Sequence, residues 1–334
     1  FCRAPSALRA SHRGGTPPQA MGEKKEKIKT KASKEAMRWA DDGTEGPIER
    51  GPGEDGNDFD IRMQEEPDGM LAAQKIAKVL KEKGVCLVQA NAPYQLVCMA
   101  HEEAESLWEE GEFKPPLRVH DDRSLLEAQL WQRALQDVDR AVWIRESDSK
   151  AVQLKNALKL LGRNMADFCA GLGPLLEKEL GVKFDRLGQP LLTCYTGDRH
   201  FSVHIDNPHT SDDAGLPDNG MRLSCTYYIN PQWDPAEGES GGMDVFLGDR
   251  EAEAGVSAVR RRPRLRIAPH ADTLVLHLSE SIAHRVISTR SPEERWYAMR
   301  LWGLNGEAMQ QMSRKLLAMR EQPKADADSD KESD

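Results

Sequence analysis

The sequence predicts an α+β protein built on a double-stranded β-helix, or jelly roll, with N-terminal helices packed on one face. Helical periodicity dominates the first half of the folded part. From residue 188 onward, short runs rich in β-branched and aromatic residues replace it, separated by Gly, Pro, Asp and Ser. Closely spaced short strands of this kind form double sheets or barrels.

The N-terminal 67 residues are expected to be disordered. Residues 1–36 carry nine Lys and Arg, and residues 37–67 carry ten acidic residues, with few aliphatic side chains in either stretch. Such segments bury too little apolar surface to offset their chain entropy. Residues 1–22 contain Arg and Ser but no acid, as transit peptides do, although Met21 is an alternative start. We therefore expect a cytoplasmic or nuclear protein, or an organellar one if residues 1–22 act as a transit peptide.

The helices and strands of the next segment, residues 68–187, support the core. Asp68 is a suitable N-cap for a helix over 69–82, Gly84 ends it, and a buried strand follows over 85–90. The periodicity then predicts helices over 93–110 and 124–137, a strand over 140–146 and a long helical region over 150–181.

The predicted jelly roll occupies residues 188–305, and residues 306–334 form a C-terminal helix and an acidic tail. Eight strand-like runs fill the jelly roll: PLLTCYT, HFSVHI, RLSCTYYIN, MDVFL, LRIA, DTLVLHL, AHRVIST and RWYAMRLW.

Composition excludes several classes of protein. The formal net charge of −9 gives no general attraction to nucleic acid. The longest apolar runs are strand-sized, so we expect no membrane span. The six cysteines lie far apart without a CxxC motif, which favours reduced thiols over a disulfide framework. Oligomeric state is open.

The stretch HFSVHIDNPH contains the first candidate metal ligands. In an extended chain, His204 and Asp206 point to the same side, as two members of a 2-His-1-carboxylate site for Fe(II) would. A second HxD, formed by His270 and Asp272, is the alternative. His284 is a possible third ligand for either pair.

Spacing favours the first pair. His284 lies 284 − 206 = 78 residues after Asp206 but 284 − 272 = 12 residues after Asp272. The longer gap suits a jelly roll, which winds through several strands before it returns beside the first ligand strand. Asp272 is adequately explained as a turn carboxylate. The histidines at four other positions are interpreted as non-ligands: His200, His209, His270 and His277.

An arginine after His284 is expected to anchor an organic co-substrate. Arg295 is predicted for this role because a guanidinium binds a carboxylate bidentately and stays charged when half buried. Arg300 is the competing anchor, but in a strand it points the other way from Arg295. Tyr228 and Tyr195 offer hydroxyl groups from two other strands.

The motifs TCYTG, HIDNP, CTYYIN, SGG, IAPHADTLVLHLSESIAHRV and RWYAM together resemble the catalytic domain of the Fe(II)/2-oxoglutarate dioxygenases. Within that superfamily the chain is most similar to prolyl 4-hydroxylases of the hypoxia-sensing, prolyl-hydroxylase-domain type. The resemblance covers about residues 70–305. The basic run RRRPR at residues 260–264 departs from it, and is interpreted as a solvated loop or as a contact for an acidic peptide.

The resemblance implies roles for six residues. His204, Asp206 and His284 would ligate the iron. Three others would bind 2-oxoglutarate: Arg295 and Tyr228 at the distal carboxylate, and Tyr195 beside the co-substrate.

The implied activity is hydroxylation of a proline in a protein or peptide, with release of succinate and CO2. Fe(II), 2-oxoglutarate, O2 and L-ascorbate are the implied cofactors and co-substrates, and no catalytic side chain is expected beyond the metal centre. The same chemistry on a small molecule or another residue type is the alternative. A non-catalytic metal or 2-oxoglutarate sensor is a second alternative, of a different class.

Overall fold

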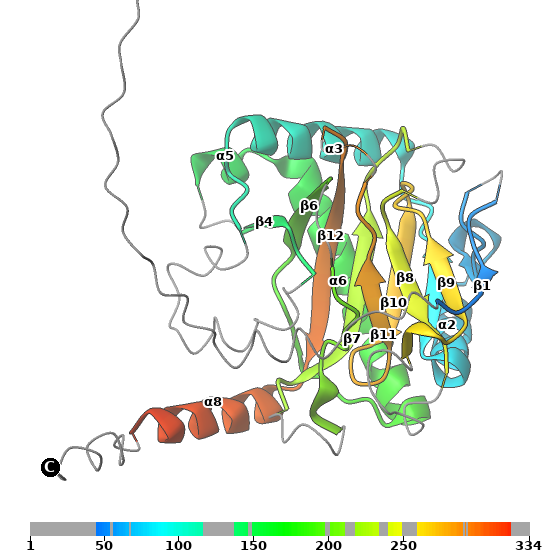
Figure 1. The fold of residues 1–334 in the computed structure, drawn as a ribbon, viewed down its shortest axis with the longest axis vertical. Helices are drawn as coiled ribbons and strands as arrows, with labels where there is room; N and C mark the ends of the chain where they lie inside the picture. Colours follow the sequence, from blue (N-terminus) through cyan, green and yellow to red (C-terminus); the bar gives the residue numbers. More distant parts are fainter. Residues whose placement is uncertain are drawn as a thin grey trace, which may run out of the picture. The chain divides into compact units, whose positions relative to one another are not determined.

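In the computed structural model, residues 45–321 are described, except for 54–55, 67, 116–136, 146–148, 198–200, 211–217, 234–239, 249–258, 290 and 292. Two β-sheets form the core, as predicted (Figure 1). In spatial order, the large sheet contains β2 (Ile61–Arg62), β3 (Val85–Gln89), β10 (Thr273–Leu278), β7 (Met221–Tyr228), β12 (Arg295–Leu304), β6 (Leu191–Thr196) and β4 (Arg140–Trp143), and β5 (Arg186–Leu187) pairs with β12. The small sheet contains β1 (Ile48–Arg50), β9 (Arg264–Ile267), β8 (Met243–Phe246) and β11 (Ala283–Val286).

Local sequence signals explain the helices that precede the jelly roll. Helix α2 (Gly69–Lys83) begins at Asp68, whose carboxylate accepts the N–H groups of Met70 and Leu71. It ends at Gly84, which has a left-handed φ of 73° that a side chain would disfavour. The remaining helices are α3 (Tyr94–Glu109), α5 (Lys150–Gln153), α6 (Asn156–Leu180), α8 (Gly306–Glu321) and the short 3-10 turns η1 (Met63–Glu65) and η3 (Pro208–Thr210).

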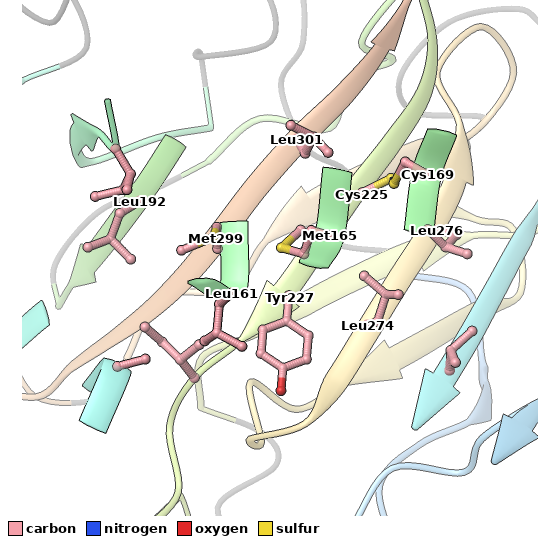
Figure 2. Close-up of a cluster of buried hydrophobic side chains, with 14 of the residues drawn as sticks. Leu161, Met165, Cys169, Leu192, Cys225, Tyr227, Leu274, Leu276, Met299 and Leu301 are labelled. Carbon is pink, nitrogen blue, oxygen red and sulfur yellow. The ribbon is translucent and has the colours of Figure 1, made fainter. Parts of the chain in front are cut away.

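Helices α2, α3 and α6 cover one face of the large sheet, which confirms the predicted arrangement. Figure 2 shows Leu161, Met165 and Cys169 of α6 directed at the side chains of the sheet. Those sheet side chains come from four strands: Leu192, Cys225, Tyr227, Leu274, Leu276, Met299 and Leu301. Burial of this apolar surface fixes the helices to the sheet.

A second apolar cluster lies between the two sheets. It joins Tyr195, Tyr228 and Trp296 of the large sheet to small-sheet residues such as Val245 and Ile267. Because side chains alternate along a strand, β12 sends one set of residues to the helices and the other set into the jelly roll. This alternation determines which of the two candidate arginines of β12, Arg295 or Arg300, faces the interior of the jelly roll.

Residues 45–66 differ from the expectation of disorder, while residues 1–44 and most of the predicted helix over 124–137 lie outside the described residues. Strand β1 pairs with β9, and β2 pairs with β3. The Asn57 amide donates to the Ala268 carbonyl and accepts from the Ala268 N–H group. These partners are distant in sequence, so the local composition could not reveal them. Among the helices that the structure describes, none is long and apolar enough to cross a membrane.

Candidate metal and co-substrate site

A backbone bridge brings two of the predicted ligands together. The N–H of His204 donates to the His284 carbonyl at 3.0 Å, and the N–H of His284 donates to the His204 carbonyl at 2.9 Å. The two imidazole centroids lie 4.3 Å apart. The predicted strand HFSVHI is reduced to this single bridge where the structure describes it. The bridge nevertheless joins residues that are 80 positions apart in the sequence, since 284 − 204 = 80.

Asp206 completes the predicted set. Its Oδ1 lies 3.4 Å from His204 Nε2 and 3.8 Å from His284 Nε2. Its Oδ2 faces the other way and accepts a hydrogen bond of 2.5 Å from the Ser224 hydroxyl. His277 Nε2 lies 3.5 Å from the same Oδ2. Asp206 therefore directs one oxygen at the two imidazoles and holds the other in the protein.

The atoms that converge here have the properties of metal ligands. Nε2 of His204, Nε2 of His284 and Oδ1 of Asp206 are buried and have no hydrogen-bond partner among the described residues. Buried polar atoms are rarely left unpaired without a reason. Two imidazoles and one carboxylate are the donors of the facial triad that holds non-haem Fe(II). These residues fit such an ion.

Burial and neighbouring charges set the protonation of this group. Burial alone raises the pKa of Asp206, but the His204 and His277 imidazoles beside it hold that pKa well below its usual value. Burial lowers the pKa of His284 well below its usual value, and His204 and His277 lower it further. An ionised carboxylate and a neutral imidazole are the forms that bind a metal, so the shifts of Asp206 and His284 favour binding. The pKa of His204 is raised instead, because the Asp137 and Asp206 carboxylates outweigh the effect of burial.

The structure places Arg295 away from this group. Its guanidinium donates to Glu105 of α3 with a shortest distance of 2.6 Å, and it lies over the ring of Trp108. Arg295 shares its face of β12 with Tyr297, which packs in the cluster against the helices. Arg295 was predicted to anchor the co-substrate, but the alternation of side chains along β12 directs it at the helices and not at the metal-ligand group.

Arg300 takes the inward position instead. It is 2% exposed, and its Nη1 donates to Asp137 Oδ1 at 2.6 Å, while its Nη2 has no hydrogen-bond partner among the residues that the structure describes. Burial opposes the charge, but the neighbouring Asp137, Tyr195 and Asp206 raise the pKa of Arg300. Arg300 is thus a buried, permanently charged donor beside the metal-ligand group.

Both predicted tyrosines lie inside the jelly roll near Arg300. Tyr195 is 2% exposed and stacks on Trp296 with ring centroids 4.0 Å apart. Tyr228 is fully buried and meets Trp296 edge-on at 5.7 Å, and its hydroxyl has no partner within the described part of the chain. Burial raises the pKa of both phenols, so they remain hydrogen-bond donors.

The second HxD pair has a structural role. Asp272 has a left-handed φ of 63° and accepts hydrogen bonds from the N–H groups of Asn91 and Ala92 and from the Tyr227 hydroxyl. These contacts tie the turn before β10 to the segment after β3. They agree with the interpretation of Asp272 as a turn carboxylate.

The basic run also has structural partners in its described part. Arg264 and Arg266 both pair with Asp244, a fully buried carboxylate on β8 that Arg285 contacts from β11. Arg264 and Arg285 reach Glu45 as well. The charges of Arg264, within the run, and Arg266, two residues beyond it, therefore serve the small sheet.

Sequence reasoning missed Asp137 and the supporting role of His277. Asp137 lies in no motif, and its position beside the two imidazoles depends on the pairing of β4 with β6. His277 follows the alternation of β10 towards the interior, but the pattern alone does not show that Asp206 faces it.

Comparison with known proteins agrees with this fold. Residues 190–302 match the family model of the 2OG-Fe(II) oxygenase superfamily. A PKHD-type hydroxylase from Sphingopyxis alaskensis is 35% identical over 68 residues, which are 20% of this chain and 28% of that protein. The match thus spans much less than half of the relative's length.

Solved structures show a similar fold at low sequence identity. A prolyl hydroxylase from Trichoplax adhaerens, solved with a hypoxia inducible factor peptide fragment, is 17% identical, with a TM-score of 0.52 over 75% of this chain and 96% of that chain. A prolyl-4-hydroxylase from Pseudomonas putida is also 17% identical, with a TM-score of 0.47 over 70% of this chain and 98% of that chain. The resemblance predicted from the sequence motifs is confirmed: residues 190–302 are similar to the 2OG-Fe(II) oxygenase superfamily.

Proposed function

We propose that the protein is an Fe(II)- and 2-oxoglutarate-dependent dioxygenase that hydroxylates a proline in a protein or peptide. The observation that carries the proposal is the convergence of His204, Asp206 and His284 beside the buried guanidinium of Arg300, whose Nη2 has no hydrogen-bond partner among the described residues. A site that bound only a metal would have no use for this guanidinium. An organic acid that chelates the metal would bind it.

The residues divide into two groups by role. His204, Asp206 and His284 hold the iron, which when bound supplies the reaction of O2 with 2-oxoglutarate that yields succinate, CO2 and one oxygen atom for the substrate. Arg300 and Tyr228 donate hydrogen bonds to the distal carboxylate of 2-oxoglutarate. Tyr195 and Trp296 form an apolar wall that excludes water from the co-substrate. Ascorbate keeps the iron reduced.

The substrate assignment rests on two further observations. The Trichoplax relative is a prolyl hydroxylase that was solved with a peptide, and the Sphingopyxis relative is a hydroxylase. The five cysteines that the structure describes are free thiols, which suits a reducing compartment such as the cytoplasm or nucleus. Both features support a peptide target inside the cell.

The chemistry is tested with the full chain. The protein is incubated in air with Fe(II), ascorbate and 2-oxoglutarate, and succinate is measured by NMR. His204→Ala removes a ligand and abolishes succinate formation. His270→Ala is the matched control, because it changes the first residue of the other HxD pair and leaves the rate within about twofold. Equal loss in both variants, or no succinate from the wild-type protein, refutes the dioxygenase assignment.

The substrate is tested separately. Proline-containing peptides are added to the same reaction, and mass spectrometry follows the gain of one oxygen atom on proline. Stimulated succinate formation coupled to oxidation of a small molecule, with every peptide unmodified, would replace the peptide by that molecule while retaining the chemistry.

A further inference from the structure

Besides the ligand atoms of His204, Asp206 and His284, the candidate metal site contains a buried carboxylate oxygen of Asp137. Asp137 Oδ2 lies 3.9 Å from His204 Nε2 and 3.7 Å from His284 Nε2. It is buried, and it shares with the three ligand atoms described above the lack of a hydrogen-bond partner among the described residues. Asp137, His204 and His284 also form one of two groups, among the described residues, whose ligand atoms all lie within 4.8 Å of one another; the other joins Asp206, His277 and His284.

The two oxygens of Asp137 have different surroundings. Oδ1 accepts the 2.6 Å hydrogen bond from Arg300 Nη1, and the Asp137 side chain is 1% exposed. A carboxylate oxygen buried to this extent needs a partner, because burial removes it from water. Arg300 supplies the partner for Oδ1. Oδ2 points between the two imidazoles, where a divalent cation would supply the other.

Asp206 leaves room for a second carboxylate. Because Asp206 Oδ2 accepts a hydrogen bond from Ser224, Asp206 offers the metal Oδ1 alone. Two imidazole nitrogens and one oxygen from Asp206 fill about half of an octahedral site. Asp137 Oδ2, which lies beside both imidazoles, is then a fourth donor.

We propose that Asp137 is a fourth protein ligand of the metal when 2-oxoglutarate is absent, and that 2-oxoglutarate displaces it. Four protein ligands leave about two octahedral positions, which is too few for a chelating 2-oxo acid and O2 together. Asp137 also holds Arg300, the guanidinium assigned to the co-substrate. Binding of 2-oxoglutarate therefore replaces Asp137 both at the metal and at the guanidinium of Arg300. The displacement step rests on the proposed function, whereas the ligand assignment does not.

Metal affinity tests the ligand assignment without turnover. Mn²⁺ is titrated into the full chain without 2-oxoglutarate, and free Mn²⁺ is followed by its EPR signal. We expect Asp137→Asn to weaken binding at least about tenfold, as loss of metal-supporting groups commonly does. Asp139→Asn is the matched control, because Asp139 is a buried carboxylate of the same segment that accepts from Thr196, and it leaves the affinity unchanged.

The wild-type protein gives a second measurement that needs no variant. Waters on the bound Mn²⁺ are counted from the broadening of its EPR lines in ¹⁷O-enriched water. Four protein ligands leave about two waters, and three leave about three. With Mn²⁺ bound, Asp137→Asn should also tighten 2-oxoglutarate binding severalfold, because the competing carboxylate is gone.

About three waters on the wild-type ion, or unchanged Mn²⁺ affinity in a folded Asp137→Asn variant, overturns the ligand assignment and leaves Asp137 as a partner of Arg300. Looser 2-oxoglutarate binding in that variant overturns the displacement step. Two waters and weakened Mn²⁺ binding, in a protein that forms no succinate, would instead retain Asp137 as a ligand and refute the proposed function.

Discussion

Arginine substitutions on the two faces of β12 test the site most directly. Arg300→Gln removes a buried guanidinium that is 2% exposed and directed at the candidate metal group, whereas Arg295→Gln removes a partly exposed guanidinium paired with Glu105. The two variants change the same residue type on the same strand. They differ in which face they alter.

The expected effect on co-substrate binding differs by an order of magnitude or more. A hydrogen bond to a charged group contributes about 1.5–3 kcal/mol, so Arg300→Gln should raise the KM for 2-oxoglutarate about 10- to 150-fold. Arg295→Gln should leave this KM within about twofold. It should cost at most about 1 kcal/mol of unfolding free energy, because the Arg295 and Glu105 side chains are 32% and 30% exposed.

The assay is succinate formation against 2-oxoglutarate concentration, with thermal melting by circular dichroism as the folding control. Because Arg300→Gln leaves Asp137 without its buried partner, Arg300→Lys is measured as well. It retains the charge but lacks the planar fork, so its KM should lie between those of the wild type and Arg300→Gln. An increase in KM for Arg295→Gln together with a normal KM for Arg300→Gln would refute the assignment of the inward face.

Three further predictions concern the metal and its surroundings. His277→Phe should weaken Mn²⁺ binding about 10- to 100-fold, because Asp206 Oδ2 loses a neighbour that orients it, and unchanged affinity in EPR titration would contradict this. Saturating Mn²⁺ at about 100 times its dissociation constant should add about 2.7 kcal/mol to the free energy of unfolding, and EDTA should reverse the gain in melting temperature. Asp244→Asn should lower the free energy of unfolding by about 3–5 kcal/mol in urea denaturation, because Arg264, Arg266 and Arg285 lose a shared buried partner, and a loss below 1 kcal/mol would refute this role.

The candidate metal ligands could be predicted from the sequence because two simple rules converge on them. Alternation in an extended segment placed His204 and Asp206 on one side, and the long interval to His284 agreed with a strand that returns beside them. The backbone bridge between His204 and His284 is the physical form of that return. Helix α2 was equally accessible, since its cap at Asp68 and its end at Gly84 are local signals.

The hydrophobic pattern of β12 does not show whether Arg295 or Arg300 faces the site. Both faces of β12 are buried, one against helices and one against the small sheet, so hydrophobicity does not show which side faces the site. Asp137 was hidden for another reason. Its proximity to His284 arises from sheet pairing between distant segments. Residues 45–66 likewise depend on partners far along the chain.

Because both faces of β12 are buried against different partners, the strand can pack in only one register. Deletion or insertion of a single residue before Arg300 would turn its guanidinium towards the helices. It would place Tyr297 or Met299 between the two sheets, where Arg300 now lies. Point substitutions on one face would leave the other unaltered, so the interior of the jelly roll can change while the packing against the helices stays the same. Changes in length at this strand would alter both at once.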